Sequence, residues 1–169
     1  MSQRLLSRLQ EKFGAAVLSA TSHCGDETAL VEAARIVEIL TFLRDDADTQ
    51  MAMLSDLTVL DTLGLDERET GRFEAVYHLR SVTHGERLRV KARIDEGPDG
   101  ELPEIDSVTS LWKMANWFER EAYDLLGVKF RGHPDLRRIL MYEEFVGHPL
   151  RKDYPKERRQ PLVRRDYTT

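Results

Sequence analysis

The residues best suited to chemistry are concentrated in the last third of the chain, from Trp117 to Pro155. An acid–base–acid triplet, Glu119-Arg120-Glu121, falls there on a predicted helix. Residues two apart on a helix diverge by roughly half a turn, so the two glutamates do not form a carboxylate dyad. The triplet is typical of a solvated helix face, on which we expect Arg120 to pair with Asp124 one turn later.

Two Gly-His-Pro turns follow the helix, and each precedes a pair of cations. Glycine permits positive φ, and proline keeps the residue before it out of the helical region. Each turn therefore presents an imidazole and two cations from a restrained backbone; these residues are His133, Arg137 and Arg138, then His148, Arg151 and Lys152. We expect such a segment to bind phosphate, to bind a carboxylate-bearing partner or to dock along another subunit.

Other kinds of site have little support. The sequence has no glycine-rich phosphate loop and no Gly-x-Ser-x-Gly elbow, so we expect neither nucleotide binding nor an active site in this chain. Its single cysteine, Cys24, excludes an internal disulfide and cannot supply the four thiolates of an iron–sulfur cluster. His133 and His148 have no histidine four residues away, so a metal site is not expected either.

An interaction surface is the interpretation that the residues favour. Arginine and aromatic residues are enriched at permanent interfaces, and the arginine fork suits the carboxylates of a partner. The acids either orient these arginines within the chain or pair across the boundary, and both alternatives stay open. The predicted interface residues are Glu119, Arg120, Glu121, Asp124, His133, Arg137, Arg138, His148, Arg151, Lys152, Asp153 and Tyr154.

The elements that must position this segment are helices and strands of one domain. Apolar residues at helical spacing predict a helix from Thr109 or Ser110 to Leu126, ended by Gly127. Upstream, residues 87–94 alternate between apolar side chains and cations, which is typical of a half-buried antiparallel strand. The other predicted elements are helices 1–12 and 34–43, and strands or extended pieces 15–20, 29–32, 57–60, 73–80 and 128–130. Residues 66–71 are a predicted charged loop and residues 96–100 a turn cluster.

These elements predict an α+β fold: two layers, with helices on one face of a mostly antiparallel sheet, and an extended C-terminal tail. The length of 169 residues suits one domain, which we place at residues 1–150, with a basic, proline-containing tail at 151–169 that docks on partner subunits. Residues 1–126 carry 14 cations against 24 acids, and residues 127–169 carry 11 against 6. An acidic body with a basic end argues against a general nucleic-acid binder.

The segment resembles the C-type subunit of the proton-pumping NADH:quinone oxidoreductase, respiratory complex I, which is the 30 kDa subunit family. That family's signature begins with Glu-Arg-Glu, followed at fixed spacing by an acid, a histidine and a basic residue. The matching residues are Glu119-Arg120-Glu121, Asp124, Leu125-Leu126, His133, Arg137 and Ile139-Leu140. The run from Gly147 to Pro155 resembles the family's ending, and the similarity covers about residues 30–160.

The resemblance implies a structural subunit in the peripheral arm of an enzyme that passes electrons from NADH through FMN and iron–sulfur clusters to quinone and translocates protons. It implies no cofactor in this chain, since FMN and the clusters belong to partner subunits. The expected partners are chiefly the D-type subunit, which contributes to the quinone site, and the neighbouring iron–sulfur subunits. The chain would then reach the membrane only through the complex, on the cytoplasmic side of the bacterial inner membrane.

Two alternatives stay open. In the first, the chain is the equivalent subunit of a membrane-bound hydrogenase or of another dehydrogenase complex. This stays open because nothing in the sequence identifies the electron donor. From a different class, it is an RNA-binding module that uses the basic tail with Tyr154 and Tyr167.

Overall fold

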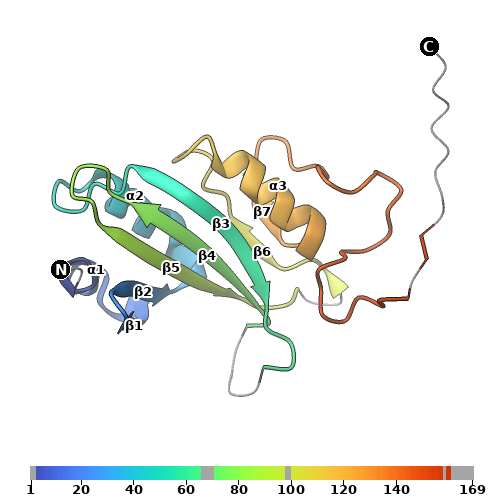
Figure 1. Cartoon of the computed structure of the whole chain (residues 1–169), viewed down its shortest axis with the longest axis horizontal. Coiled ribbons are helices and arrows are strands. Elements are labelled where there is room, and N and C mark those ends of the chain that lie inside the picture. Colours follow the sequence, from blue (N-terminus) through green and yellow to red (C-terminus); the bar gives the residue numbers. More distant parts are fainter. Residues whose placement is uncertain (1–2, 66–70, 98–99, 158, 161–169) are drawn as a thin grey trace, which may run out of the picture.

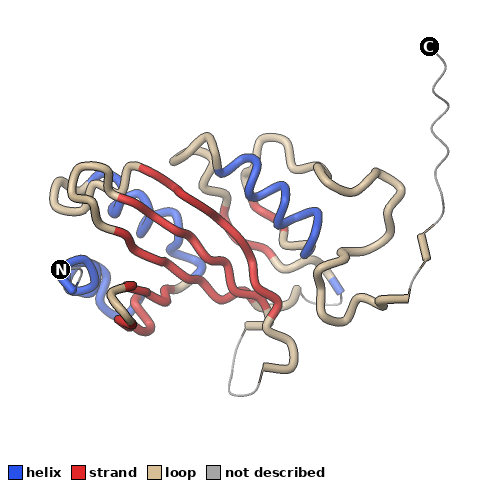
Figure 2. Tube along the Cα trace, in the orientation of Figure 1, coloured by secondary structure: helices blue, strands red, loops and turns tan. Residues whose placement is uncertain are grey.

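A computed structural model of the chain describes residues 3–65, 71–97, 100–157 and 159–160. These residues form three α-helices, two short 3-10 helices and seven strands, arranged in two layers (Figures 1 and 2). The helices are α1 Gln3–Phe13, η1 Gly14–Ala16, η2 Ala33–Arg35, α2 Ile36–Asp45 and α3 Ala115–Leu126. The strands are β1 Val17–His23, β2 Asp26–Val31, β3 Met53–Asp61, β4 Phe73–Arg80, β5 Arg87–Ile94, β6 Glu104–Asp106 and β7 Lys129–Arg131.

Five strands form the main sheet in the order β1-β2-β5-β4-β3. The pairs β1–β2, β4–β5 and β3–β4 are antiparallel, whereas β2 and β5 run parallel. The α+β prediction with a mostly antiparallel sheet is thereby confirmed. The predicted strands 73–80 and 87–94 also have the observed bounds of β4 and β5.

The helices pack on one face of this sheet because the inner strands turn most of their apolar side chains to that face. In β5, Leu88, Val90, Ala92 and Ile94 are buried, and the cations between them lie on the other face. Leucines and isoleucines of α1 and α2 join the same core cluster. In the view of Figure 1, α2 lies behind the sheet, and the opposite face of β4 and β5 is turned toward the reader.

The chain leaves the sheet to form a smaller unit around α3. Strands β6 and β7 pair in parallel, with α3 as their connection, and α3 packs beside β3. From Gly132 to Gln160 the described chain has neither helix nor strand and follows an irregular course beside α3 (Figure 2). We call residues 132–157 the C-terminal strap.

Several predicted boundaries were wrong by a few residues. The third helix begins at Ala115 and not near Ser110, because residues 109–114 form turns and no side chain caps the helix. β1 begins two residues later than predicted, after a 3-10 turn, and β3 extends the predicted strand 57–60 at its N-terminal side. The predicted loop 66–71 and turn 96–100 lie partly outside the described residues.

Candidate functional site

The acid–base–acid triplet does not form a solvated helix face, because two of its three side chains are buried. Glu119 is 0% exposed and Arg120 is 9% exposed, whereas Glu121 is exposed. The prediction failed because α3 is covered on two sides, by the core and by the C-terminal strap. Every interaction of Glu119 and Arg120 described below is with the chain itself.

Glu119 holds the loop after β6 against α3. Its Oε1 accepts the Val108 N–H at 2.7 Å, and its Oε2 accepts the Ser107 hydroxyl at 2.7 Å. Burial raises the pKa of Glu119 to about 7, and these two hydrogen bonds offset the burial only in part. The carboxyl therefore titrates near neutral pH while remaining inside the fold.

Asp124 organises the middle of the strap. Its Oδ2 accepts three consecutive backbone N–H groups, those of Ile139, Leu140 and Met141, at 2.7–3.0 Å. Its Oδ1 accepts Arg138 Nη1 at 2.7 Å. Burial opposes the ionised form, but these donors outweigh it and lower the pKa of Asp124. The predicted Arg120–Asp124 pair is therefore wrong, because Arg138 and the strap backbone occupy this carboxylate.

Arg120 instead donates hydrogen bonds to backbone carbonyl groups of the strap. Its Nε donates to the Arg137 carbonyl at 3.2 Å and its Nη2 to the Arg138 carbonyl at 3.4 Å. The guanidinium also lies 5.1 Å from the centre of the Trp117 ring. Arg120 and Asp124 thus hold neighbouring positions of the same strap from one helix.

The two turn histidines also contact α3. His133 Nε2 lies 3.2 Å from the Asn116 carbonyl near the start of the helix, and His148 Nδ1 lies 2.9 Å from the Asp124 carbonyl near its end. Arg151 donates from Nε to the Leu126 carbonyl at 2.6 Å and from Nη2 to the Gly127 carbonyl. A helix end leaves its last carbonyls without intrahelical partners, and Arg151 satisfies two at this end.

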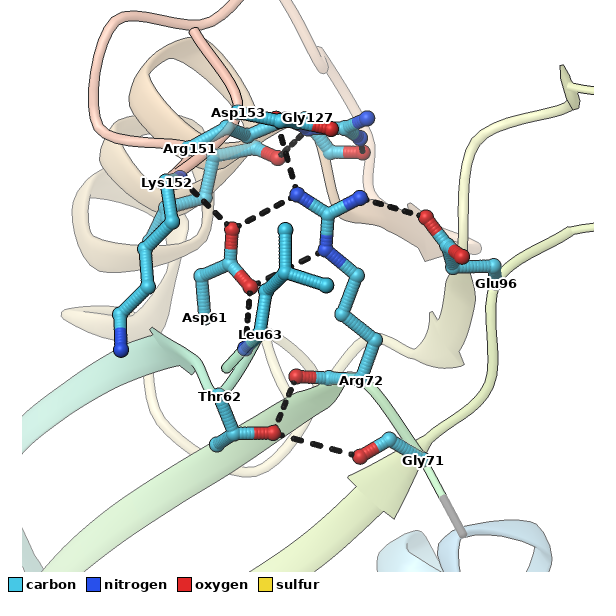
Figure 3. Close-up of polar contacts among 11 residues, drawn as sticks. Asp61, Thr62, Leu63, Gly71, Arg72, Glu96, Gly127, Arg151, Lys152 and Asp153 are labelled. Atoms are coloured by element: carbon cyan, nitrogen blue, oxygen red, sulfur yellow. Dashed lines mark hydrogen bonds and ion pairs between the residues drawn. The ribbon is translucent and has the colours of Figure 1, made fainter. Parts of the chain in front are cut away.

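A second set of contacts joins the strap to the main sheet (Figure 3). Arg72 binds both oxygens of Asp61, at 3.0 and 2.8 Å, and also forms ion pairs with Glu96 at 2.6 Å and Asp153 at 2.9 Å. The backbone N–H of Lys152 donates to Asp61 Oδ2 at 2.9 Å. We call these five residues the Arg72 clasp.

Electrostatic interactions stabilise the Arg72 clasp. Burial opposes ionisation of Asp61, but donors from Arg72, Lys152 and Leu63 outweigh it and lower its pKa to about 2. The hydrogen bond from Arg72 lowers the pKa of Asp153 as well. Phe73 lies next to both guanidinium groups, about 5 Å from those of Arg72 and Arg151.

The comparisons with known proteins identify the family of the chain. A family model described as "Respiratory-chain NADH dehydrogenase, 30 Kd subunit" matches residues 29–160. The chain belongs to this family. It is therefore a subunit of a respiratory-chain NADH dehydrogenase, as the resemblance of its signature predicted.

Relatives in this family match nearly the whole chain. The C-type subunit of NADH-quinone oxidoreductase from Citrifermentans bemidjiense is 46% identical over 154 residues, covering 91% of this chain and 89% of the relative. The same subunit from Geobacter sulfurreducens is 45% identical over the same share of this chain and 90% of its own.

Solved structures share the fold. A trypsin-resistant fragment (1-134) of Nqo5 superposes with a TM-score of 0.67 at 30% identity, covering 79% of this chain and 98% of the fragment. A chain of the archaeal membrane-bound sulfane sulfur reductase gives a TM-score of 0.67 at 24% identity, covering 92% of this chain and 86% of that one. At this identity the second similarity concerns the fold alone.

The family's signature residues mostly face the chain itself, but some predicted interface residues face outward. Arg137 has a side chain that is 71% exposed, and it pairs with Asp135 at 3.0 Å. Glu121 and the Lys152 side chain are also exposed. Tyr154 is half-buried against the Phe145 ring. The predicted interface role of all these residues stays a prediction, as does the domain boundary at residue 150.

Apolar side chains are exposed beside these residues. They are Met114, Trp117, Leu140, Val146 and Leu150, each between 52% and 58% exposed. A groove of about 660 Å³ lies between α3 and the strap, and its lining is half apolar or aromatic and half charged: Tyr123, Leu136, Met141 and Tyr142, with Arg137, Arg138, Glu143 and Glu144. A contiguous patch of such groups marks an interaction site, whereas single exposed apolar residues are normal on a protein surface.

Sequence reasoning missed Asp61, Arg72 and Glu96. Asp61 is 11 residues from Arg72 and 91 from Lys152, so no local spacing connects them. Among the described residues, no group of three or more His, Cys, Asp and Glu is placed to hold a metal ion. Within the same residues, the helices are too short or too polar to cross a membrane.

Proposed function

We propose that this chain is a non-catalytic subunit in the peripheral arm of an NADH:quinone oxidoreductase and binds no cofactor of its own. The complex would transfer electrons from NADH through FMN and iron–sulfur clusters to quinone, with proton translocation. This chain would dock chiefly on the D-type subunit, beside the iron–sulfur subunits, and would hold that quinone-site partner in position. The complex would attach it to the cytoplasmic side of the inner membrane.

One observation carries this proposal: two charged residues of the signature, Arg120 and Asp124, bind the backbone of the strap from α3. Because Arg120 and Asp124 bind the strap backbone, and Arg138 of the strap binds Asp124, the strap has a defined course before any partner arrives. A pre-organised surface loses less conformational entropy on binding. We expect the exposed apolar side chains of α3 and the strap to form the contact area, together with the exposed cation Arg137.

Rigid positioning is a physical requirement in such an enzyme. Electron tunnelling falls exponentially with distance, so a shift of a few ångström between redox centres slows transfer severely. We expect this chain to bury an obligate interface of roughly 2,000–5,000 Å².

Two neighbouring arginines of the strap have different surroundings, so their variants test docking and folding separately. Arg137→Glu changes an exposed side chain, whereas Arg138→Glu breaks the contact with buried Asp124. We expect Arg137→Glu to leave the stability of the isolated chain nearly unchanged but to reduce its retention in the purified arm. The control is Arg4→Glu, since the Arg4 side chain is 47% exposed and also has one ion pair, with the partly buried Glu86.

Stoichiometric retention of the Arg137→Glu chain, equal to that of the control, would count against docking through the strap. A pull-down from membranes in mild detergent tests the complex itself. Recovery with a flavin-bearing NADH-oxidising subunit supports the proposal, and recovery with a nickel-binding subunit supports the hydrogenase alternative. Iron or flavin bound stoichiometrically to the purified chain would contradict the cofactor-free role.

A further inference from the structure

The face of the main sheet opposite the helices carries cations that neither the strap nor the Arg72 clasp uses. β5 places four of them at alternate positions, and β4 adds Arg80 at its end. The four on β5 are Arg87, Arg89, Lys91 and Arg93. Figure 1 shows this face of β4 and β5 without a helix in front of it. The body of the chain is acidic, so this gathering of positive charge is local.

The strand register places like charges opposite one another at one end of this face. Arg80 pairs directly with Arg87, and both are exposed. Like charges directly opposite in an antiparallel pair are destabilising. Further along the sheet the pattern changes, since Lys91 Nζ lies 2.8 Å from Glu74 Oε1. The repulsion is therefore concentrated near the β4–β5 turn.

The neighbouring histidine, His78, is half-buried among charges of both signs. His78 lies opposite Arg89 in the register, and its pKa is lowered by burial and then by Arg89 and Lys91, against Asp56 and Asp26. A hollow of about 450 Å³ opens at this end of the sheet. Its charged and histidine lining residues are Asp26, Glu27, Asp56, His78, Arg80, Arg87 and Arg89.

We propose that Arg80, Arg87 and Arg89 form a second docking surface, and that its occupant is an acidic segment of another protein subunit. Discrete carboxylates would relieve the Arg80–Arg87 repulsion and bind each guanidinium in bidentate fashion. Asp26 and Asp56 line the same hollow as the arginines, so the surface offers separate cationic positions and no continuous cationic path, and a phosphate backbone or an anionic membrane fits it less well. This inference rests on the proposed function only in that it requires an assembled complex.

The experiment measures cysteine accessibility in the full chain. In a Cys24→Ser background, Arg87→Cys and Arg89→Cys are each labelled with a neutral maleimide, in the isolated chain and in the purified complex. Glu11→Cys on α1 is the matched control, since the Glu11 side chain is 76% exposed and α1 packs on the opposite face of the sheet. We expect labelling of both variants to become about tenfold slower in the complex, because an interface excludes water, with the control unchanged.

Labelling of both variants as fast in the complex as in the isolated chain would overturn the inference. Fast labelling in the complex can be observed only if the chain is part of the complex. Failure of the proposed function is a different result, since the unmodified chain would then not co-purify. A photo-crosslinker placed at position 87 identifies the occupant. A cross-link to a peptide rich in Asp and Glu supports the inference, and one to lipid, to nucleic acid or to a non-acidic peptide overturns it.

Discussion

Glu119 is buried and accepts hydrogen bonds from Ser107 and Val108, and burial raises its pKa to about 7. An acid whose pKa is higher in the folded than in the unfolded state binds more protons when folded. Its stabilising effect is therefore fully present below pH 4.5 and is lost as pH rises to about 7. Ionisation of Glu119 near neutral pH therefore lowers the stability of the fold.

Glu119→Gln separates charge from hydrogen bonding. A glutamine can accept the Val108 N–H and donate to the Ser107 hydroxyl, so both contacts survive without a buried charge. We expect the variant to be more stable than the parent at pH 8, by about 2 kcal/mol, and to lose most of the pH dependence between pH 4.5 and 7. Urea unfolding at several pH values measures this.

The control is Glu121→Gln, two residues along the same helix and exposed. We expect the free energy of unfolding of this variant to equal that of the parent chain at every pH. Two results would contradict the role assigned to Glu119. One is a free energy of unfolding of the parent chain that does not fall from pH 4.5 to 7. The other is a free energy of unfolding of Glu119→Gln that falls as much as that of the parent.

At the scale of elements, the end of α3 is where helix and strap meet. Gly127 has φ +70, in the left-handed region that favours glycine, and its N–H closes the helix onto the Tyr123 carbonyl. A Cβ at this position would also collide with the His148 ring and the Arg151 guanidinium. The glycine therefore serves two needs, the turn of the backbone and the close approach of the strap.

Gly127→Ala tests how far the strap depends on this helix end. Backbone strain alone costs about 1–2 kcal/mol, and displacement of His148 and Arg151 should add to it. The matched control is Gly132→Ala, since Gly132 has φ +80 with no atom within 4 Å of a Cβ. We expect the Gly127 variant to lose more stability in urea unfolding and to expose the strap to trypsin. Equal losses would contradict a packing role for Gly127.

At the scale of the whole molecule, the Arg72 clasp connects the strap to the main sheet. The Asp61 side chain is 2% exposed and that of Arg72 is 11% exposed, so the pair is largely withdrawn from water. Removing one partner of a buried pair leaves an uncompensated charge, which is strongly destabilising. The clasp thereby makes the position of residues 151–154 depend on the fold of β3 and β4.

Arg72→Gln should therefore free this part of the strap. We expect a loss of about 3 kcal/mol in the free energy of unfolding and faster hydrogen exchange at the Lys152 amide, which now donates to Asp61. Arg35→Gln is the control, because its ion pair with Glu38 is exposed and should contribute less than about 1 kcal/mol. Unchanged exchange at Lys152 would show that the clasp does not hold the strap.

The elements that could be predicted from the sequence are those whose pattern is local. The alternation in 87–94 gave β5 its bounds, since period-two burial depends only on neighbouring residues. The start of α3 could not be predicted in this way. Residues 109–114 form turns instead, and Glu119 of α3 holds the loop Ser107–Val108 through contacts 11 and 12 residues away.

The sequence by itself determined the family, because the signature is a set of residue types at fixed spacing, and it determined the α+β class. Only the tertiary structure decided what those residues do. It placed Glu119, Arg120 and Asp124 inside the chain, and it brought Asp61 and Arg72 to the strap across up to 91 residues. Burial and pairing depend on which distant segments pack together, and this packing cannot be read from the spacing of residues along the chain.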